Sequence, residues 1–237
     1  MEPIKSTADF LGEREQNLSA KAYDAMLQML ISRELPANTV LQERRLAELL
    51  NISRTPVRDA LTRLENEGLI SRTAGRTLVV RQFSLRELIE TLHVRRTLEA
   101  EAARLATGRV PVAELDELEA CVRRLLEAEV PNAEEDWIVD SQLHKMLSHY
   151  IGNQLLTQYI ETLRLKTRMF NLSVAPERFE SAHQDHLNIV QALKVGYHEH
   201  LAIIEALRSG DADAAQKAAA AHIDSVRQGI INRFSAI

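Results

Sequence analysis

The chain has 237 residues, of which 45% are hydrophobic, and a formal net charge of −5 at pH 7. This length allows one large domain or two modest ones, and no segment approaches the ~20 consecutive apolar residues of a membrane-spanning helix. The single cysteine, Cys121, excludes an internal disulfide and a cysteine-rich zinc site. Because the start of the chain also lacks a signal-peptide pattern, we expect a protein of the reducing cytoplasm.

Residues 19–82 predict a small α+β domain. The preceding residues, 1–18, are polar and unpatterned, and we expect them to form a flexible arm. Two β-prone runs on either side of Gly75 are a hairpin signal. Before them, apolar residues at helical spacing predict three short helices. The first begins at about Ser19, the second covers about 42–50 and the third covers about 54–66.

The β-prone runs stop at about Ser84, and residues 83–237 predict an all-helical domain. Prolines and glycines separate the predicted helices. The clearest boundary is Gly210 followed by Asp211, which suit a left-handed helix end and the N-cap of the next helix. Six helices are expected, over 84–107, 112–129, 134–151, 153–173, 178–208 and 211–234.

Arginines open the third predicted helix. Three helices followed by a two-stranded wing indicate a winged helix-turn-helix, whose third helix enters the DNA major groove by its N-terminal end. Arg54 and Arg58 are spaced to project from one helical face, where a guanidinium can donate two hydrogen bonds to guanine. The alternative is an ordinary solvated helix. Residues 41–82 carry eight arginines against five acidic residues, so the acidic total does not exclude a local DNA-binding surface.

The stretch LQERRLAELLNISRTPVRDALTRLENEGLI resembles the DNA-binding domain of the GntR family of bacterial regulators. The resemblance covers about residues 20–82 and implies double-stranded operator DNA as a partner. The sequence departs from the family at Asn38 and Thr77, where glycine is usual, although asparagine tolerates a left-handed backbone. The DNA contacts of the family would fall on Arg44, Ser53, Arg54, Thr55 and Arg58, with Gly75 at the tip of the wing.

The chain from about Leu85 resembles the FCD effector domain, which marks the FadR-type branch of the family. The opening helix reads LRELIETLHVRRTLEAEAARLAT, and later signatures are DSQLH and HLAIIEALRSGDADAAQKAAAAH. With six helices and not seven, the domain is more similar to the VanR subgroup than to FadR itself. The fold class is therefore predicted as mainly α, a winged helix-turn-helix followed by a bundle of about six helices. The resemblance further implies a homodimer that binds a small-molecule effector.

Arginines of the helical domain are candidates to bind that effector. In the FCD pattern Arg95 points into the effector cavity, where it could bind a carboxylate with two hydrogen bonds. The alternative is an internal ion pair with Glu99, one helical turn away. Arg164 and Arg168, on the helix expected over 153–173, are further candidates on the same reasoning.

Four side chains of the helical domain are candidate ligands of a divalent metal ion. Asp140 and His144 are one turn apart on one predicted helix and so face the same way. His200 lies ten residues before Gly210 and His222 twelve after it, so an antiparallel hairpin would hold both at nearly the same level. One carboxylate and three imidazoles suit Zn²⁺, Ni²⁺ or Mn²⁺, and the motif matches the FCD resemblance at all four positions. The alternative is that these are structural residues, because the chain has eight histidines.

These features together predict a transcriptional regulator and not an enzyme. We expect a homodimeric repressor that reads a pseudo-palindromic operator and responds to a small carboxylate bound near the metal. One alternative is a metal-free sensor of acyl-CoA, and another is a direct sensor of the metal ion. A metalloenzyme is the third, but no motif such as HExxH pairs the ligands with a general base.

Overall fold

The computed structural model describes residues 7–129, 132–174 and 183–235. The chain divides into two compact units. The first contains Met1–Ser84 and Arg168–Ala175, and the second contains Leu85–Thr167 and Pro176–Ile237.

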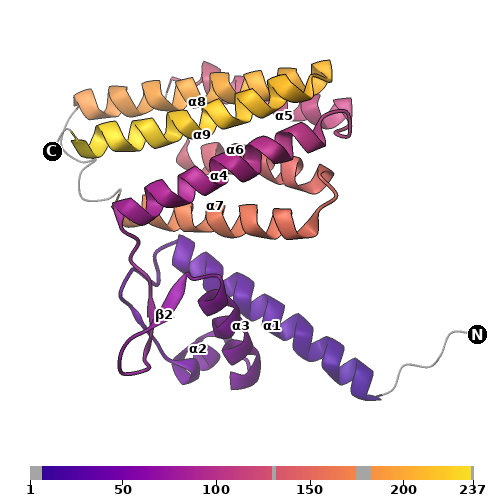
Figure 1. The fold of residues 1–237 in the computed structure, drawn as a ribbon. Coiled ribbons are helices and arrows are strands. Elements are labelled where there is room, and N and C mark those ends of the chain that lie inside the picture. The colour runs from indigo at the N-terminus through magenta and orange to yellow at the C-terminus, as the bar shows by residue number, and fades with distance from the viewer. Residues whose placement is uncertain (1–6, 130–131, 175–182, 236–237) are drawn as a thin grey trace, which may run out of the picture. The chain divides into compact units, whose positions relative to one another are not determined.

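The first unit contains a winged helix-turn-helix, as the sequence predicts (Figure 1). Strand β3 pairs antiparallel with β2 on one side and with β1 on the other, which gives the sheet order β1-β3-β2. Helices α1 and α3 pack together over buried apolar side chains that include Met26 and Leu64. The elements are α1 (Thr7–Ile31), β1 (Val40–Leu41), α2 (Glu43–Leu50), α3 (Arg54–Asn66), β2 (Ile70–Arg72) and β3 (Leu78–Val80).

Two features of this unit differ from the prediction. Helix α1 begins at Thr7 and not near Ser19, so the expectation of an arm over residues 1–18 is wrong for the part of the chain described from Thr7 onward. Its first turns contain several strong helix formers, which extend a helix already held by its packed C-terminal half. Strand β1 was not predicted, because two residues carry no periodic signal.

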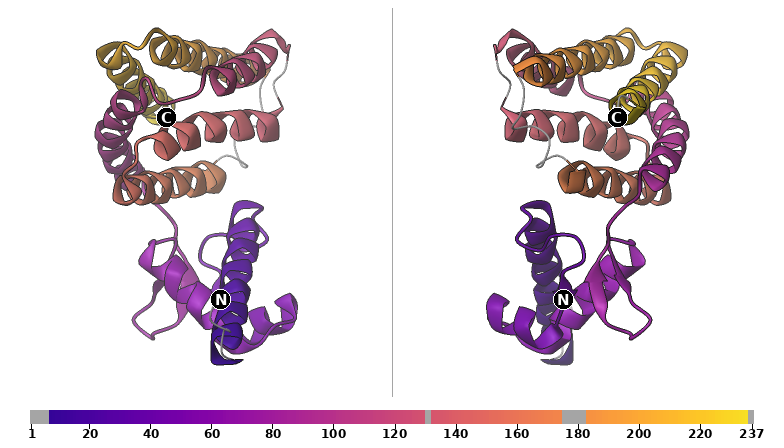
Figure 2. Two further views of the ribbon diagram at one scale, coloured as in Figure 1. Left: turned by 90° about the vertical axis from the view of Figure 1, so that its right-hand side faces the viewer. Right: turned by 90° about the vertical axis from the view of Figure 1, so that its left-hand side faces the viewer.

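Six helices follow Ser84 in the described residues, as expected, and they form the second unit except for the end of α7 from Arg168 onward. Helix α9 packs against both α4 and α8, as two views of the ribbon also show (Figures 1 and 2). Small buried side chains such as Ala103 of α4 and Ala219 of α9 allow the helices to approach closely. The helices are α4 (Leu85–Ala106), α5 (Val112–Glu127), α6 (Ala133–Tyr150), α7 (Gln154–Val174), α8 (His183–Ser209) and α9 (Ala212–Ser235).

The turn between α8 and α9 sets the alignment of this helical hairpin. Gly210 has a φ of +75°, and the backbone N–H of Ala214 donates to Oδ1 of Asp211 at 2.9 Å. Both features confirm the boundary that the sequence predicts at Gly210 and Asp211. Because the turn is tight, residues at similar distances on either side of it lie at the same level of the two helices.

We expect Gly210→Ala to lower the free energy of unfolding by about 1 kcal/mol, because an L-residue pays this much for a left-handed backbone. A Cβ at Gly210 would meet no atom within 4 Å, so the cost would come from the backbone alone. Gly196→Ala is the matched control, since a Cβ there also meets nothing within 4 Å. Gly196 lies inside α8, and its replacement should raise stability by up to about 1 kcal/mol. Urea unfolding would measure both, and equal effects would contradict the backbone explanation.

Candidate functional site

Helix α3 exposes the residues of its first turn that were predicted to contact DNA. Arg54, Thr55 and Arg58 are exposed, whereas Val57 is fully buried against the rest of the domain. Ser53 is the N-cap residue, and its side chain makes no capping hydrogen bond. The hydroxyl groups and the unpaired amides of a first helical turn are suited to bind a phosphate.

Two of the predicted DNA-contacting arginines form ion pairs with glutamates of α2. Nη2 of Arg58 donates to Glu43 at 3.0 Å, and Nε of Arg44 donates to Glu48 at 2.9 Å. The hydrogen bond from Arg58 lowers the pKa of the Glu43 carboxyl. Arg54 has no ion pair with any residue that the structure describes, although its charge also lowers the pKa of Glu43, after that of Arg58.

The wing turn exposes Gly75, as expected, but takes a different form from a glycine turn. The backbone N–H of Arg76 donates to the carbonyl of Thr73 at 2.8 Å. Arg76 and not Gly75 has the left-handed backbone, with a φ of 60°. A β-branched residue rarely adopts this left-handed conformation, and Thr77 accordingly does not have it. Arg76 therefore places at the tip of the wing an exposed cation that sequence reasoning did not identify.

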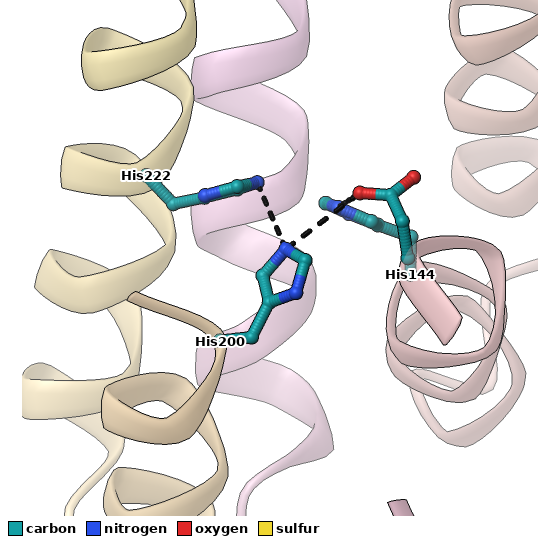
Figure 3. A group of neighbouring side chains, drawn as sticks. His144, His200 and His222 are labelled. Atoms are coloured by element: carbon teal, nitrogen blue, oxygen red, sulfur yellow. Dashed lines mark hydrogen bonds and ion pairs between the residues drawn. The ribbon is translucent and has the colours of Figure 1, made fainter. Parts of the chain in front are cut away.

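In the helical unit, α6, α8 and α9 bring Asp140, His144, His200 and His222 together. One possible ligand atom from each residue lies within 4.8 Å of all the others. Nε2 of His200 and Nε2 of His222 are 3.3 Å apart (Figure 3). Oδ1 of Asp140 lies 3.4 Å from Nε2 of His144 and 3.6 Å from Nε2 of His200. The structure thus realises the alignment that the spacing around Gly210 predicts.

Carboxylates behind two of the histidines determine which ring atom faces the cluster. Glu99 of α4 contacts Nδ1 of His144, and Glu199 contacts Nδ1 of His222 at 2.9 Å. A carboxylate at Nδ1 favours the proton on that nitrogen, which leaves the Nε2 lone pair directed toward the cluster. Nδ1 of His200 has no hydrogen-bond partner among the described residues.

The charges around the cluster favour the protonation states that bind a metal. Burial opposes ionisation of Asp140, but the Arg164 guanidinium and then His144 outweigh it and hold the pKa of this carboxyl well below its usual range. Burial, followed by the neighbouring His222, lowers the pKa of His200 well below its ordinary value. A carboxylate anion and a neutral imidazole are the forms in which these side chains act as ligands.

The cluster fits a divalent cation. Glu199 favours the proton of His222 on Nδ1, so His200 either donates from Nε2 to Nε2 of His222 or, with its own proton on Nδ1, places two Nε2 lone pairs 3.3 Å apart. Buried acceptors without a partner are costly, and a cation would satisfy both. Two nitrogens bound to one tetrahedral zinc ion at about 2.05 Å are also separated by about 3.3 Å.

We expect Glu99→Gln to weaken metal binding by about 10- to 100-fold, because the carboxylate that orients His144 is lost. A chelator competition would measure the affinity, and the melting temperature of the metal-free protein would report the cost to the fold. Glu90→Gln is the control, since Glu90 lies on the same helix in an exposed ion pair with Arg86. Equal affinity in the two variants would show that Glu99 does not position the ligand.

Arg95 forms the ion pair that was the alternative to effector binding. Its side chain is buried, and its Nε donates to Oε1 of Glu99 at 2.6 Å. Its Nη1 donates to Oγ1 of Thr167 on α7 at 3.2 Å. Glu99 therefore joins Arg95 to His144, and Arg95 lies behind the candidate metal ligands.

Arg164 lies beside the cluster itself. Its Nη2 donates to Oδ2 of Asp140 at 2.6 Å, and its guanidinium lies 5.6 Å from the centre of the Trp137 ring. Arg168 is half-buried one turn further along α7. Arg164 thus contacts a candidate metal ligand directly, whereas Arg95 is linked to one through Glu99.

Sequence reasoning missed three residues that support the cluster. Glu99 was considered only as the partner of Arg95, and neither Glu199 nor Thr167 was identified. Glu199 precedes His200 directly, so a carboxylate beside a candidate ligand was the available signal. No local pattern could connect Thr167 with Arg95, because the two residues belong to different helices.

Both units match known bacterial sequences. Residues 18–80 match the description "Bacterial regulatory proteins, gntR family", and residues 90–197 match the FCD domain. The Glc operon transcriptional activator of Escherichia coli (strain K12) is 30% identical over 176 residues, which cover 64% of this chain and 69% of that protein. The chain belongs to the GntR family of bacterial regulators. Within the family, its FCD domain supports the FadR-type branch.

Other similarities extend over most of the chain. The HTH-type transcriptional repressor RspR of Escherichia coli (strain K12) is 23% identical over 221 residues, or 91% of this chain and 90% of that protein. The solved structure of E. coli McbR/YncC has a TM-score of 0.73 at 22% identity and covers 92% of this chain and 98% of that chain. At this identity, the likeness to McbR/YncC shows that the fold is shared.

Membership of the GntR family identifies the chain as a DNA-binding transcriptional regulator and not an enzyme. The FCD domain indicates that the regulator binds a small molecule. Among the described helices, none is both long and apolar enough to cross a membrane.

Proposed function

We propose that the protein is a cytoplasmic one-component repressor that binds a pseudo-palindromic operator as a homodimer. Residues 19–82 would form the DNA-binding domain, and residues 83–237 the effector-binding and dimerisation domain. The observation that carries this proposal is the exposed start of α3, where Arg54 and Arg58 stand clear of the domain core. Two such helices in a symmetric dimer would read two half-sites.

The DNA contacts are proposed to divide into two kinds. Arg54 and Arg58 would read base edges, because an arginine can form a bidentate contact with guanine. The remaining contacts, Arg44, Ser53, Thr55 and the wing at Gly75, would bind phosphates or the minor groove. Phosphate contacts set the position on DNA, whereas base contacts select the sequence.

In the helical domain we propose a divalent ion, Zn²⁺, Ni²⁺ or Mn²⁺, held by Asp140, His144, His200 and His222. The support is the short separation of their ligand atoms, all within 4.8 Å of one another. A bound ion would supply a positive charge that attracts the carboxylate of an effector. We also propose that the domain is of the VanR subgroup, because six helices and not seven follow Ser84 in the described residues.

Arginines are proposed to complete the effector site. Arg164 would bind the effector carboxylate, since its ion pair with Asp140 places its guanidinium beside the proposed metal ion. Arg168 is the further proposed contact on α7, and Arg95 would contribute through the N–H groups that Glu99 and Thr167 leave available. An effector acts on DNA binding only if its affinity differs between the two arrangements of the protein.

Repression is the simplest action of such a dimer, because occupying an operator blocks a promoter without any further surface. The relatives include a protein described as an activator and one described as a repressor. Transcription in vitro from a promoter that carries the selected operator would test this point. An increase in transcript on addition of the protein would show activation and contradict the proposed repression.

Elemental analysis of untagged protein purified without chelator tests the proposed metal centre. About one transition metal ion per chain is the expected result for four converging ligands. No metal after incubation with Zn²⁺, Ni²⁺ or Mn²⁺ would favour the metal-free acyl-CoA sensor. Operator affinity that follows the free metal concentration, without an organic ligand, would favour a direct metal sensor.

A further inference from the structure

A carboxylate of α2 holds the guanidinium of Arg58 at the edge of the proposed DNA surface. Nη2 of Arg58 lies 3.0 Å from Oε2 of Glu43, and Nε lies 3.2 Å and 3.3 Å from Oε1 and Oε2. The arginine side chain is 62% exposed, whereas the glutamate side chain is 34% exposed. Buried Leu46 and Ala47 anchor α2 to the domain. Glu43 therefore stands on a packed helix and fixes a side chain that extends into solvent.

The contact leaves the outer end of Arg58 available. A guanidinium has five N–H donors, and Glu43 engages Nε–H and one N–H of Nη2. The three donors that remain lie on the two terminal nitrogens, which form the fork that binds guanine or phosphate. Because Glu43 already restricts the rotamers of Arg58, binding would cost less side-chain entropy.

The same carboxylate places a negative charge close to where DNA phosphates would lie. Glu43 therefore offsets one positive charge that would otherwise attract DNA of any sequence. Arg54 forms no ion pair with the residues that the structure describes, and its interaction with the charge of Glu43 is weaker than that of Arg58. Specificity is a difference between two affinities, so a group that lowers sequence-independent binding raises it.

We propose that Glu43 is a specificity-determining residue of the DNA surface: it orients Arg58 toward a base edge and weakens binding to unselected DNA. This inference rests on the proposed role of α3 in DNA binding. Glu43 would act through Arg58 and would not itself contact a base.

Two substitutions in the full-length protein separate orientation from charge. The DNA would be a duplex selected from a random library by the unmodified protein, together with a scrambled duplex of the same composition. Glu43→Gln should bind the scrambled duplex about three- to tenfold more tightly, with a steeper dependence on salt. The preference for the selected duplex should fall about tenfold, as expected when a bidentate base contact is no longer oriented.

Glu43→Asp keeps the charge but shortens the side chain, so the carboxylate no longer reaches both donors of Arg58. It should lose preference for the selected duplex without tighter binding to the scrambled duplex. Glu90→Gln, which breaks an exposed Arg–Glu pair of the helical unit, should leave both affinities unchanged. Thermal unfolding would show whether each variant is folded.

Preference that stays unchanged in both Glu43 variants would overturn the inference. An equal loss of affinity for both duplexes would also overturn it, because that result marks a purely structural role. If the unmodified protein selects no sequence at all, the DNA-binding proposal fails, and the inference fails with it. The behaviour of the unmodified protein therefore distinguishes the two failures.

Discussion

Replacing both His200 and His222 with alanine is expected to abolish metal binding while the fold survives. The substitutions remove two of four ligands, including the pair of Nε2 atoms that lie 3.3 Å apart. Metal content should fall from about one ion per chain to a trace, since a carboxylate and one imidazole make a weak site. Addition of Zn²⁺ at about 100 times its Kd should stabilise the unmodified protein by about 2.7 kcal/mol and leave the variant unaffected.

The chain offers a matched control for this experiment. His93 and His149 are exposed histidines of the same unit, and neither belongs to the cluster. Replacing both with alanine removes the same number of imidazoles and should leave metal content at its original level. Metal content that is unchanged in the His200 and His222 variant would return these histidines to a structural role.

Arg54→Ala is expected to abolish the preference for operator DNA. A bidentate contact between arginine and guanine discriminates by about 1–3 kcal/mol, which corresponds to about 5- to 150-fold in relative affinity. Because Arg54 is exposed at the first position of α3, its loss should leave the melting temperature nearly unchanged. A competition gel shift with selected and scrambled duplexes measures the preference.

An exposed arginine of the helical unit controls for the loss of charge. Arg86 pairs with Glu90 on the surface of α4, and Arg86→Ala should keep the preference intact. Weaker binding of Arg54→Ala to every sequence, with preference retained, would assign Arg54 to a phosphate and not to a base.

The sequence was sufficient to predict features that depend on the backbone geometry of a few neighbouring residues. The positions of Gly210 and Asp211 predicted the turn between α8 and α9, and the spacing around that turn predicted the approach of His200 and His222. Asn38 likewise has the left-handed backbone that its place in the sequence suggested, with a φ of 68°. In each case, backbone geometry between nearby residues determined the outcome.

Other contacts between helices could not be predicted in the same way. The pairing of Arg58 with Glu43 depends on how α2 packs against α3, and that of Arg95 with Thr167 on how α4 meets α7. A single sequence contains no direct record of either packing. For Arg95 the sequence left two roles open, and only tertiary structure could show that the ion pair with Glu99 forms.

The four ligands of the proposed metal centre come from α6, α8 and α9, so the whole of α7 and α8 separates the first ligand from the last along the chain. Within an unfolded chain, only Asp140 and His144 lie close together, and two ligands capture an ion weakly. The apolar core around the centre has to assemble before all four groups meet. We therefore expect loading to follow folding, so that cells starved of metal would accumulate a folded, ion-free regulator in place of an unfolded chain destined for proteolysis.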